Sequence, residues 1–507
     1  MYKLRVSPAI LENRLDCGFY NPVGLEYTEL LRINSDLMPL SDLVDPDRKI
    51  TNGVRGPDWQ DSKYKLIRLQ DCDHWIVNHE EAESISFAQF EENRRCRLKV
   101  NDIVVAIGGY VGNAAVLTED CFAVIGQHSA VLPEPEKKGI DSRYLLAYLN
   151  SKVAEAIFSR YVSGTVQAGI NLEDLRLLPA PIVDSLAQKY IGDKVRQAEQ
   201  LRAWAKRCRG KINDYFDGLF TGISLTKPEH HHTRVSLDIL VPRLNAEYYS
   251  DHYTQVEKGL LDRFGKLTTL GRLAPTVRAK VKPAADCTYK EIGDLDVGKG
   301  AFSSGTFYKY GEVPNNAKRI FDEGDVAVST RRPNRGAVAV IEESSSTTFY
   351  SVFLARLKPK NKNFGYWLKE FLRHDAGKLL LLQRCTWTTY PVISEDDIET
   401  IPVPEIPNDW DFVARLSRQS VELEAFATNL TTSAKTLVEA LIEGQLTEQQ
   451  LIQAQQALDD GDNSLDQAIL SKLSGEGYGI ANATPLFSDI DELYRLLESA
   501  AQAEAEE

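Results

Sequence analysis

Apolar residues step by three and four positions along two widely separated stretches of the chain. The first stretch contains Val195, Ala198, Leu201, Ala205, Cys208, Ile212, Tyr215 and Leu219. The second contains Val413, Leu416, Ser420, Leu423, Ala427, Leu430, Ala434, Leu437 and Leu441. This spacing places the residues on one helical face and repeats like a coiled-coil seam. The pattern predicts two long helices, each about 50 Å long, with ordinary amphipathic core helices as the simpler alternative.

Short β-like segments, separated by glycine, asparagine and aspartate turns, precede each long helix. The segment VNDIVVA (100–106) is echoed by EGDVAVS (323–329). The segment GNAAVL (112–117) is echoed in the same order by GAVAVI (336–341). An ordered duplication of this kind indicates one compact domain that is present twice.

Each copy ends in the same way. A helical stretch begins near Tyr144 in the first copy and near Tyr366 in the second. A polar loop and a Pro-x-Pro sequence follow, as SGTVQAGINLEDLRLLPAPI (163–182) and as CTWTTYPVISEDDIETIPVPEI (385–406). Strand-like and helical segments therefore alternate within each copy, which predicts a mixed α/β domain.

The predicted fold is mixed α/β, with two homologous globular domains, two long helices and a small acidic helical tail. Helices of similar length within one chain can pair, most simply as an antiparallel coiled coil with one domain near each end. The predicted segments are 1–182 for the first domain, 183–222 for the first helix, 223–233 for a linker, 234–404 for the second domain, 405–443 for the second helix and 444–507 for the tail.

The net charge of −14 is carried mainly by the tail. Residues 443–507 contain 14 acidic residues against Lys472 and Arg495, which leaves only −2 for the other 442 residues. Local Lys and Arg, rather than the total, govern contacts to DNA phosphates, so the acidic total does not exclude nucleic acid. The tail is predicted to dock a partner or to occupy a basic DNA-binding surface, with a solvated helical cap as the alternative.

The cysteines and the apolar runs indicate the compartment. The seven cysteines are scattered without a C-x-x-C pair, so we expect reduced and mostly buried thiols. The start MYKLRVSPAI has no apolar signal core, and no run of about 18 apolar residues occurs. The expected location is the cytoplasm.

Taken in order, these motifs resemble the specificity (S) subunits of type I restriction-modification systems. The hallmarks are RLD…FY at 14–20, the strand turn Asn101-Asp102-Ile103, the glycine loop at 108–113 and SGTVQ…LPAP at 163–181. The resemblance covers about residues 8–443. The second copy departs from the pattern, because residues 386–390 replace the Ser-Gly-Thr-x-Gln loop, and the tail lies outside it.

The resemblance implies a non-catalytic DNA-recognition subunit. Each domain, as a target recognition domain, would read one half of a bipartite DNA site in the major groove, and the helical pair would set the gap between the halves. DNA methyltransferase subunits, expected as two copies, would dock on the helices. They would supply S-adenosylmethionine, so no cofactor is expected on this chain. A restriction and translocation subunit or other anti-phage defence effectors are further expected partners, and no membrane is expected.

Polar loops after predicted strands are the candidate DNA contacts of the first domain. Base edges are read by Arg, Asn, Gln and hydroxyl side chains, whereas main-chain N–H groups and cations contact phosphates. The candidates are Thr51, Asn52, Arg55 and Trp59 in TNGVRGPDW, Gly109, Tyr110 and Asn113 in GGYVGN, then Gln127, His128, Thr165 and Gln167. A structural turn or a loop cap is the alternative role at these positions.

In the second domain the sequence STRRPNRG (329–336) takes the place of the glycine loop. Arg278, Lys280 and Lys282 alternate along the chain and are predicted to share one face of a strand. The candidate DNA contacts are Arg331, Arg332, Asn334 and Arg335, then Arg278, Lys280 and Lys282, then Thr386, Trp387 and Thr388. The loop GKGAFSSG (298–305) is a further candidate. A solvated charged turn is the alternative for each group.

Enzymatic functions find little support in the sequence. The amino-methylase signature [DN]-P-P-[YF] and the nucleophile elbow G-x-S-x-G are absent. His74 and His79 lie among acidic residues in CDHWIVNHEE, but no metal site and no catalytic residue is predicted there. The alternative function is a stand-alone sequence-specific DNA-binding regulator, or a scaffold, without methylase partners.

Overall fold

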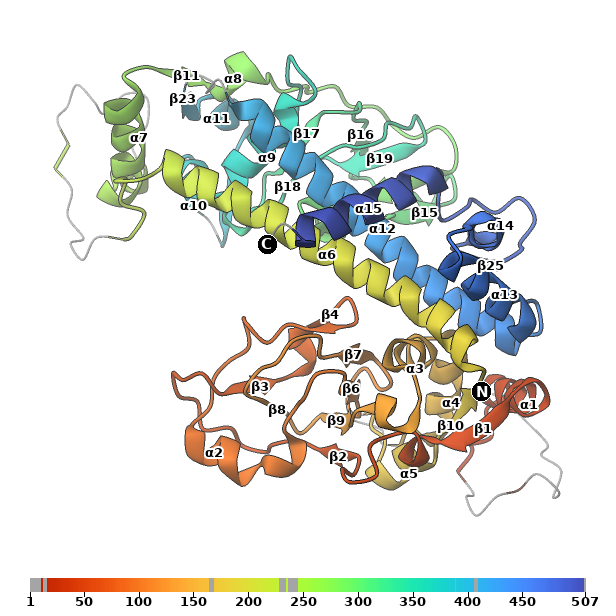
Figure 1. The fold of residues 1–507 in the computed structure, drawn as a ribbon. Coiled ribbons are helices and arrows are strands. Elements are labelled where there is room, and N and C mark those ends of the chain that lie inside the picture. The colour runs from red at the N-terminus through yellow and green to blue at the C-terminus, as the bar shows by residue number, and fades with distance from the viewer. Residues whose placement is uncertain are drawn as a thin grey trace. The chain divides into compact units, whose positions relative to one another are not determined.

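The computed structural model describes residue 11 and residues 16–163, 168–227, 234–235, 245–387, 389–404 and 409–505 (Figure 1). Contacts divide the chain into two units. Unit 1 comprises residues 1–203 and 424–507, and unit 2 comprises residues 204–423. The division falls inside both long helices, α6 (Ser185–Leu219) and α12 (Trp410–Ile442), so each unit contains part of both. Within the described ranges no helix is long and apolar enough to span a membrane.

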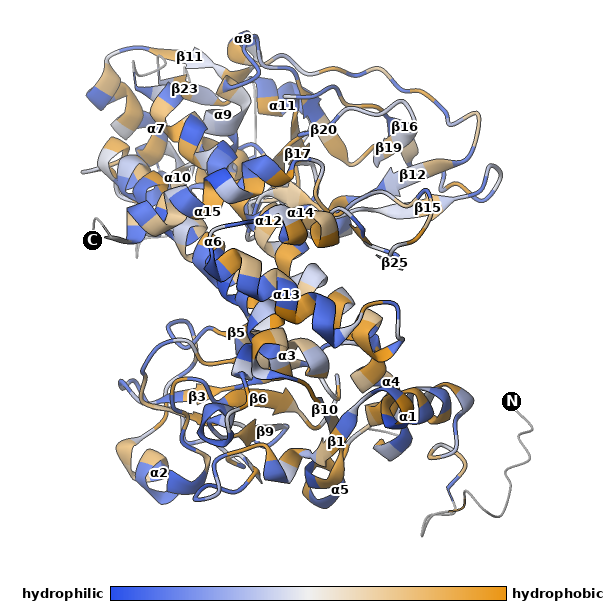
Figure 2. Cartoon of the chain, turned by 45° about the vertical axis from the view of Figure 1, so that its right-hand side comes forward, coloured by the Kyte–Doolittle hydropathy of each residue, from blue (hydrophilic) through white to orange (hydrophobic). Residues whose placement is uncertain are grey.

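Unit 1 is built on a six-stranded sheet around β6 (Ile103–Ala106). β6 pairs antiparallel with both β9 (Ser129–Leu132) and β7 (Ala114–Val116), and all residues of these three strands are buried. Figure 2 shows the matching hydrophobic character of β6 and β9. The outer strands are β2 (Thr51–Asn52), β4 (Cys72–Asp73) and β5 (Ile76–Val77), and a separate parallel pair joins β3 (Lys65–Ile67) to β8 (Ala123–Ile125). Continuous apolar runs form the central strands because both of their faces are covered.

Helices cover this sheet and close the domain. They are α1 (Pro22–Asn34), α2 (Phe87–Glu92), α3 (Ser142–Leu149), α4 (Lys152–Tyr161) and α5 (Leu172–Leu177). Side-chain oxygens of Asp141, Ser151 and Asn171 accept hydrogen bonds from the first-turn N–H groups of α3, α4 and α5 and so fix where each begins. α3 packs against β7, and α1 against α4.

The Pro-x-Pro sequence forms β10 (Pro179–Ile182), which pairs antiparallel with β1 (Asp36–Pro39). Two tyrosine hydroxyls of α3 donate to this strand: Tyr144 to Pro181 O at 3.0 Å and Tyr148 to Pro179 O at 2.6 Å. Proline lacks an N–H, so it cannot donate a hydrogen bond to a further strand. The carbonyls of Pro179 and Pro181 instead accept the hydrogen bonds of the two tyrosine hydroxyls. These bonds tie the chain entering α6 to both α3 and the start of the domain.

Unit 2 repeats this order of elements. Its helices are α7 (Asp251–Phe264), α8 (Leu270–Leu273), α9 (Phe364–Arg373), α10 (Asp375–Gln383) and α11 (Glu395–Glu399). Its strands are β11 (Leu267–Thr269), β12 (Cys287–Lys290), β13 (Leu295–Asp296), β14 (Ala301–Phe302), β15 (Thr306–Tyr308), β16 (Ala317–Arg319), β17 (Val326–Ser329), β18 (Val338–Val340), β19 (Thr348–Ser351), β20 (Leu354–Leu357), β21 (Thr386–Trp387), β22 (Pro391–Val392) and β23 (Pro402–Pro404).

The strand pairings of unit 1 recur in unit 2. β17 lies between β18 and β20 as β6 lies between β7 and β9. β12 and β19 are parallel like β3 and β8, and β11 pairs with β23 as β1 pairs with β10. The duplication seen in the sequence is therefore a duplication of strand topology. β15 and β16 enlarge the β12–β19 pair to four strands in unit 2.

The strand predicted over residues 278–282 does not form. The Val277 N–H just before it donates to Arg356 O at 2.8 Å, and the Val281 N–H within it donates to Lys318 O at 2.8 Å. Those two acceptors lie in different strands, so no continuous ladder develops. Alternating charge alone could not distinguish this extended segment from a strand.

Most of the predicted helical seam is buried, but its register shifts at the end of α6. Val195, Ala198 and Leu201 in unit 1 are at most 1% exposed. In unit 2 the predicted positions Tyr215 and Leu219 are only half-buried, whereas Phe216 and Phe220 are buried. The prediction was wrong by one residue there. A straight helix has 3.6 residues per turn, so a seam with a period of 3.5 drifts around it.

Within unit 2, α6 and α12 run antiparallel. The Cys208 thiol lies 3.6 Å from Gln419 Oε1, and the Tyr215 hydroxyl donates to Asp409 at 3.1 Å. Residue numbers thus rise along α6 as they fall along α12. The Phe216 ring also packs on Trp367 of α9, with ring centroids 5.7 Å apart, which joins α6 to the core of unit 2.

The tail packs on α6 and α12 within unit 1. It contains α13 (Glu448–Asp459), α14 (Ser464–Leu470), the hairpin of β24 (Leu473–Ser474) and β25 (Gly477–Tyr478), and α15 (Ile490–Ala505). Lys194 of α6 and Asp466 of α14 form an ion pair at 2.6 Å with both side chains 1% exposed. The hydroxyls of Tyr190 and Tyr494 also donate to Asp466, each at 2.6 Å. The tail is therefore part of the core of unit 1.

We predict that Lys194→Met destabilises unit 1 strongly. Burial alone raises the pKa of the Asp466 carboxyl, but Lys194 and the two tyrosine hydroxyls outweigh that effect and hold the pKa below its usual value. Removing the cation would leave a buried carboxylate uncompensated, which costs about 3–5 kcal/mol. Thermal and urea unfolding of the full chain, followed by circular dichroism, measures the loss.

Lys189→Met is the matched control. Lys189 of the same helix also pairs with the tail, with Asp459 at 2.8 Å, but both side chains are about half exposed. Solvent screens such pairs, so this variant should leave the unfolding midpoint nearly unchanged. Equal effects of the two substitutions would contradict a stabilising role for the buried pair.

Candidate nucleic-acid interface

In unit 1 the candidate loops of the first domain meet at one edge of the sheet. The Val54 N–H donates to Ile125 O at 2.8 Å, which places the 51–55 segment beside the end of β8. The Ile107 N–H donates to His128 O at 2.8 Å, and the Gly109 N–H to Ala168 O at 3.1 Å. The glycine loop therefore lies between the Gln127–His128 turn and the chain near Ala168. Thr165 and Gln167 lie outside the described residues.

Several candidate side chains at this edge face solvent. Tyr110 is 79% exposed, and Arg55, Asn113, Gln127 and His128 are also exposed. Gly109 adopts a φ of +80°, in the left-handed region that glycine tolerates best, and this lets the loop turn back toward β7. The arrangement presents amide, imidazole and guanidinium groups from three loops together.

Thr51 and Asn52 both contact Arg95. Thr51 is buried, and its hydroxyl accepts a hydrogen bond from Arg95 Nη1 at 2.7 Å. The Asn52 side-chain oxygen accepts from the same nitrogen at 3.2 Å. The two residues thus orient the exposed Arg95, which sequence reasoning missed. Two consecutive arginines at 94–95, just before a predicted strand, were the available signal.

Trp59 is half exposed. The Arg68 guanidinium lies 5.1 Å from the centre of its ring. Arg68 is also paired with Glu83 at 3.2 Å, so its charge is partly compensated. Trp59 therefore offers a ring whose one face is already occupied by a cation.

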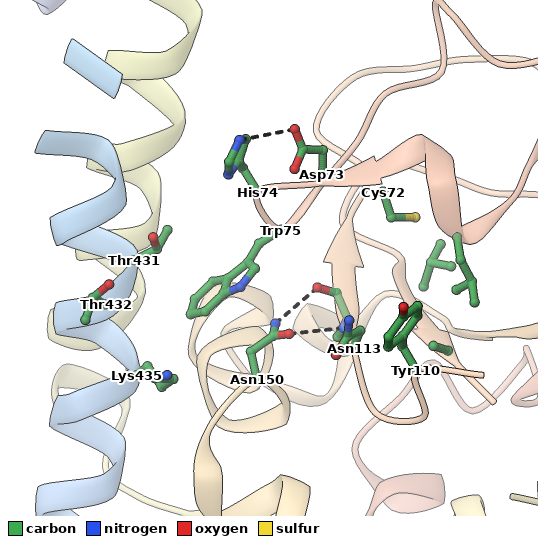
Figure 3. A pocket seen from close by; sticks show the side chains of 14 residues that line it. Cys72, Asp73, His74, Trp75, Tyr110, Asn113, Asn150, Thr431, Thr432 and Lys435 are labelled. Atoms are coloured by element: carbon green, nitrogen blue, oxygen red, sulfur yellow. Dashed lines mark hydrogen bonds and ion pairs between the residues drawn. The ribbon is translucent and has the colours of Figure 1, made fainter. Parts of the chain in front are cut away.

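A cavity of about 480 Å³ opens beside the glycine loop (Figure 3). Tyr110 and Asn113 line it from the loop, and His74 and Trp75 from the β4–β5 turn. The Asn150 side chain exchanges two hydrogen bonds with the Ala114 backbone, both at 3.1 Å, and so holds the start of β7 against the end of α3. Among the residues that the structure describes, no three His, Cys, Asp or Glu side chains gather as a metal ion would need.

Unit 2 assembles the same three loops. The Thr330 N–H donates to Phe353 O at 2.9 Å, as Ile107 does to His128 O, and the Arg332 N–H donates to Pro391 O at 2.9 Å. The turn after β17 therefore lies between the β19–β20 turn and the β21–β22 hairpin. Thr386 and Trp387 in that hairpin are exposed. Thr388 lies outside the described part of the chain.

The arginine turn is braced by aromatic rings. The Arg331 guanidinium lies 4.7 Å from the Phe353 ring centre, and that of Arg332 lies 5.3 Å from the Tyr390 ring centre. Arg332 has a φ of 49° and precedes a short helical turn at Pro333–Arg335, whose Asn334 and Arg335 are exposed. Such stacking orients a guanidinium while its N–H groups remain available to a ligand. Sequence reasoning did not find Phe353 or Tyr390, since their partners are far away in the chain.

Arg278 is committed to carboxylates. It hydrogen-bonds to Asp396 and lies 3.7 Å from Glu399 and 3.8 Å from Glu395. The bond to Asp396 and the nearby negative charges raise the pKa of the Arg278 guanidinium. Arg278 thus fastens the 276–282 segment to α11, whereas Lys280 and Lys282 of that segment are exposed.

Residues 48–205 match the family described as the type I restriction modification DNA specificity domain. The specificity subunit of the type I restriction enzyme EcoBI from Escherichia coli is 28% identical over 177 residues, which are 34% of this chain and 36% of that protein. The alignment thus spans about a third of that relative.

Solved structures give a weaker similarity. An S subunit of a type I restriction-modification system from M. genitalium has a TM-score of 0.38 and 14% identity, covering 83% of this chain and 96% of its own. An HsdS subunit from Thermoanaerobacter tengcongensis has a TM-score of 0.28 and 13% identity, covering 82% and 97%.

The family match covers most of the first domain and the first half of α6, and it includes all three loops of the edge: the glycine loop, the Gln127–His128 turn and the chain near Ala168. The order of the repeated motifs extends the same pattern into the second half of the chain. Residues 48–205 are thus similar to the DNA specificity domain of type I restriction-modification systems.

Proposed function

We propose that this chain is the DNA sequence-specificity subunit of a type I restriction-modification or methylation-linked defence complex. The observation that carries the proposal is the recurrence of one three-loop edge in both units. Each edge is framed by the same backbone bond, from Ile107 to His128 in unit 1 and from Thr330 to Phe353 in unit 2. A bipartite DNA site needs two readers, and one edge would read each half.

The exposed side chains suit base recognition. Arginine forks pair with the O6 and N7 atoms of guanine, and Asn or Gln amides with the N6 and N7 atoms of adenine. Unit 1 offers Asn113 and Gln127, and unit 2 offers Arg332 and Arg335. The two edges carry different chemistry, so we infer that the two half-sites differ in sequence.

We infer that α6 and α12 act together as an antiparallel coiled coil that sets the gap between the half-sites. Their antiparallel contacts within unit 2 and the burial of Val195, Ala198 and Leu201 in unit 1 support this. DNA methyltransferase subunits, two in the full complex, would dock on these helices and bring S-adenosylmethionine. The chain would therefore act without catalysing a reaction, beside a restriction and translocation subunit or another effector.

A map of methylated bases tests the proposal. We expect a split motif in host DNA only when this chain and the methyltransferase encoded beside it are expressed together. Exchanging residues 234–404 for those of another family member should change one half of the motif and leave the other half intact. Long-read sequencing that records base modification gives the result.

Other outcomes distinguish other functions. If no methyltransferase copurifies and the chain alone binds one DNA sequence, a stand-alone regulator is the better account. If it binds DNA without sequence preference, it is a scaffold. Either result would replace the proposed function.

The arginine turn can be tested by substitution. Arg332→Gln with Arg335→Gln should weaken binding to the cognate duplex by about 1–3 kcal/mol for each base that the arginines recognise. Only the half-site read by unit 2 should lose its preference. Arg278→Gln is the control, because Arg278 is already paired with Asp396, and it should leave the preference unchanged. Competition binding with duplexes altered in one half-site measures the preferences of the wild type, the double variant and the control. If the double variant lost its preference at both half-sites, the arginine turn would not be the reader of one half-site.

The spacing role of the helices makes a mechanical prediction. Inserting one heptad into each helix lengthens the pair by about 10 Å, which corresponds to roughly three base pairs. The methylated motif should then show a wider gap between unchanged half-sites. An unchanged gap, in a variant that still methylates DNA, would contradict the spacing role.

A further inference from the structure

Unit 2 contains a cavity of about 260 Å³ directly behind the arginine turn. It is enclosed by Gly336 at the end of that turn, by the β13–β14 hairpin, by the junction of α9 and α10, and by α6. The cationic side chains that line it are Arg209, Lys299, Arg335, Arg373 and Lys378, and His374 lies among them. The only carboxylate among the lining residues that the structure describes is Glu370.

Glu370 offsets only part of this charge, because it is held mainly by Lys369 and lies 4.0 Å from Arg373 Nη1. The buried Lys369 ammonium lies 2.9 Å from Glu370 Oε1, and the Ser417 hydroxyl donates to the same oxygen at 2.7 Å. Burial by itself raises the pKa of the Glu370 carboxyl, but Lys369, Arg373 and Ser417 outweigh it and lower the pKa. The carboxylate therefore stays ionised and balances Lys369.

Three further carboxylates pair with cavity residues, and each of them is exposed. Asp375 lies 3.0 Å from Lys378, Asp296 lies 3.9 Å from Lys299, and Asp217 lies 3.3 Å from His374. Their side chains are 74%, 46% and 73% exposed. Solvent screens such pairs, so Lys299 and Lys378 are only weakly compensated by them.

The cations are held in place. Arg373 Nη2 donates to Val297 O at 2.6 Å and to Gly298 O at 2.7 Å, which joins the end of α9 to the β13–β14 hairpin. Gly300 has a φ of +64°, and a Cβ atom there would lie 2.1 Å from Arg373 Nη1. The side chains of Lys299, Arg373 and Lys378 are only 23%, 16% and 32% exposed. Cations withdrawn from water in this way favour an anion between them.

The equivalent place in unit 1 provides an internal comparison. The cavity beside its glycine loop lies between equivalent elements, and Thr431, Thr432 and Lys435 of α12 line it (Figure 3), whereas α6 contributes Arg209 to the unit 2 cavity. It is lined by one lysine, Lys435, and by one carboxylate, Asp73, together with Asn150, Thr431 and Thr432. The fold therefore does not require the positive charge, and the charge in unit 2 points to a ligand.

We propose that this cavity, hereafter the unit 2 phosphate site, binds a backbone phosphate of DNA next to the half-site that the arginine turn reads. This inference rests on the proposed function. Arg335 lies both in the exposed turn and in the cavity wall, so a DNA strand crossing the turn passes the cavity. Phosphate oxygens accept hydrogen bonds from arginine and lysine together, and such contacts set register rather than sequence. Unit 1 would then depend less on this backbone contact.

The test uses the full chain carrying Lys299→Gln with Lys378→Gln. Each phosphate neutralised by the protein contributes about 0.9 to the slope of log affinity against log salt. We expect the slope to fall by about 1 and the affinity at 0.1 M salt to fall about tenfold. The loss should be equal on cognate and random duplexes. Fluorescence polarisation of labelled duplexes over a NaCl series measures both quantities.

Two control variants separate this site from general charge loss. Lys358→Gln with Lys362→Gln removes two exposed lysines of unit 2 that pair with Asp322 and Glu323 outside the cavity. It should leave the slope unchanged. Lys299→Arg with Lys378→Arg keeps the charges and should retain the slope. Unfolding midpoints of all three variants show whether each is folded.

The outcomes separate the inference from the proposed function. If the wild-type chain prefers a split site but the slope is the same in the Gln variant, the phosphate site is wrong and the function stands. If the chain has no sequence preference but the slope falls, the phosphate site stands and the function fails. If the chain binds no duplex DNA, both are wrong.

Free anions are tested separately. Inorganic phosphate and sulfate are titrated into the DNA-free chain and its Gln variant, with the unfolding midpoint as readout. Saturable stabilisation of the wild type below about 1 mM phosphate, with an unchanged DNA salt slope in the variant, would make this a site for a small anion. That result would overturn the DNA assignment.

Discussion

The antiparallel pairing of a closing proline strand with an opening strand is the constraint on which the rest of the structure depends. In unit 1 it joins β10 to β1, and in unit 2 it joins β23 to β11. A matching backbone bond extends each pair, from Leu40 to Leu178 at 3.0 Å and from Leu270 to Ile401 at 2.8 Å. Each long helix begins a few residues after this closure, so its start is tied to the beginning of its own domain. Proline suits such a two-stranded edge, because it cannot donate to a further strand.

The two units share a buried frame and differ in their exposed loops. The central strands β6 and β17 are buried along their whole length. The turns after them diverge, with a glycine loop in unit 1 and a stacked arginine turn in unit 2. A rigid frame with variable loops is the usual way in which one fold is given different ligands. The cavities behind the two turns also differ, although the buried strands beside them are alike.

Charge in this chain is arranged by location. The acidic tail carries most of the net charge, yet one of its carboxylates, Asp466, is buried against Lys194. The tail therefore combines an interior ion pair with an acidic exterior. In unit 2 the positive charges gather around the arginine turn and the cavity behind it. The near-zero charge of the rest of the chain results from local groups of opposite sign, which act separately on the scale of a Debye length of about 10 Å.

The sequence by itself determined the mixed α/β class, the duplicated order of elements and the existence of the two long helices. These properties depend on local periodicity, on turn residues and on self-similarity, which are visible along the chain. It also indicated the glycine loop and its arginine counterpart, because both copies place them after the same strand, but it did not indicate the β19–β20 turn at Phe353. The candidate side chains remain predictions, and the structure shows only where they lie.

Only the tertiary structure decided what those side chains touch. Thr51 holds Arg95, Arg278 is bound by three carboxylates, and Phe353 stands where unit 1 has His128. The Phe216 ring likewise packs on Trp367, about 150 residues away. The cations of the unit 2 cavity lie far apart in the chain, between Arg209 and Lys378. The physical reason is that hydrogen bonds, ion pairs and ring contacts join residues by distance in space, and separation along the chain carries no record of that distance.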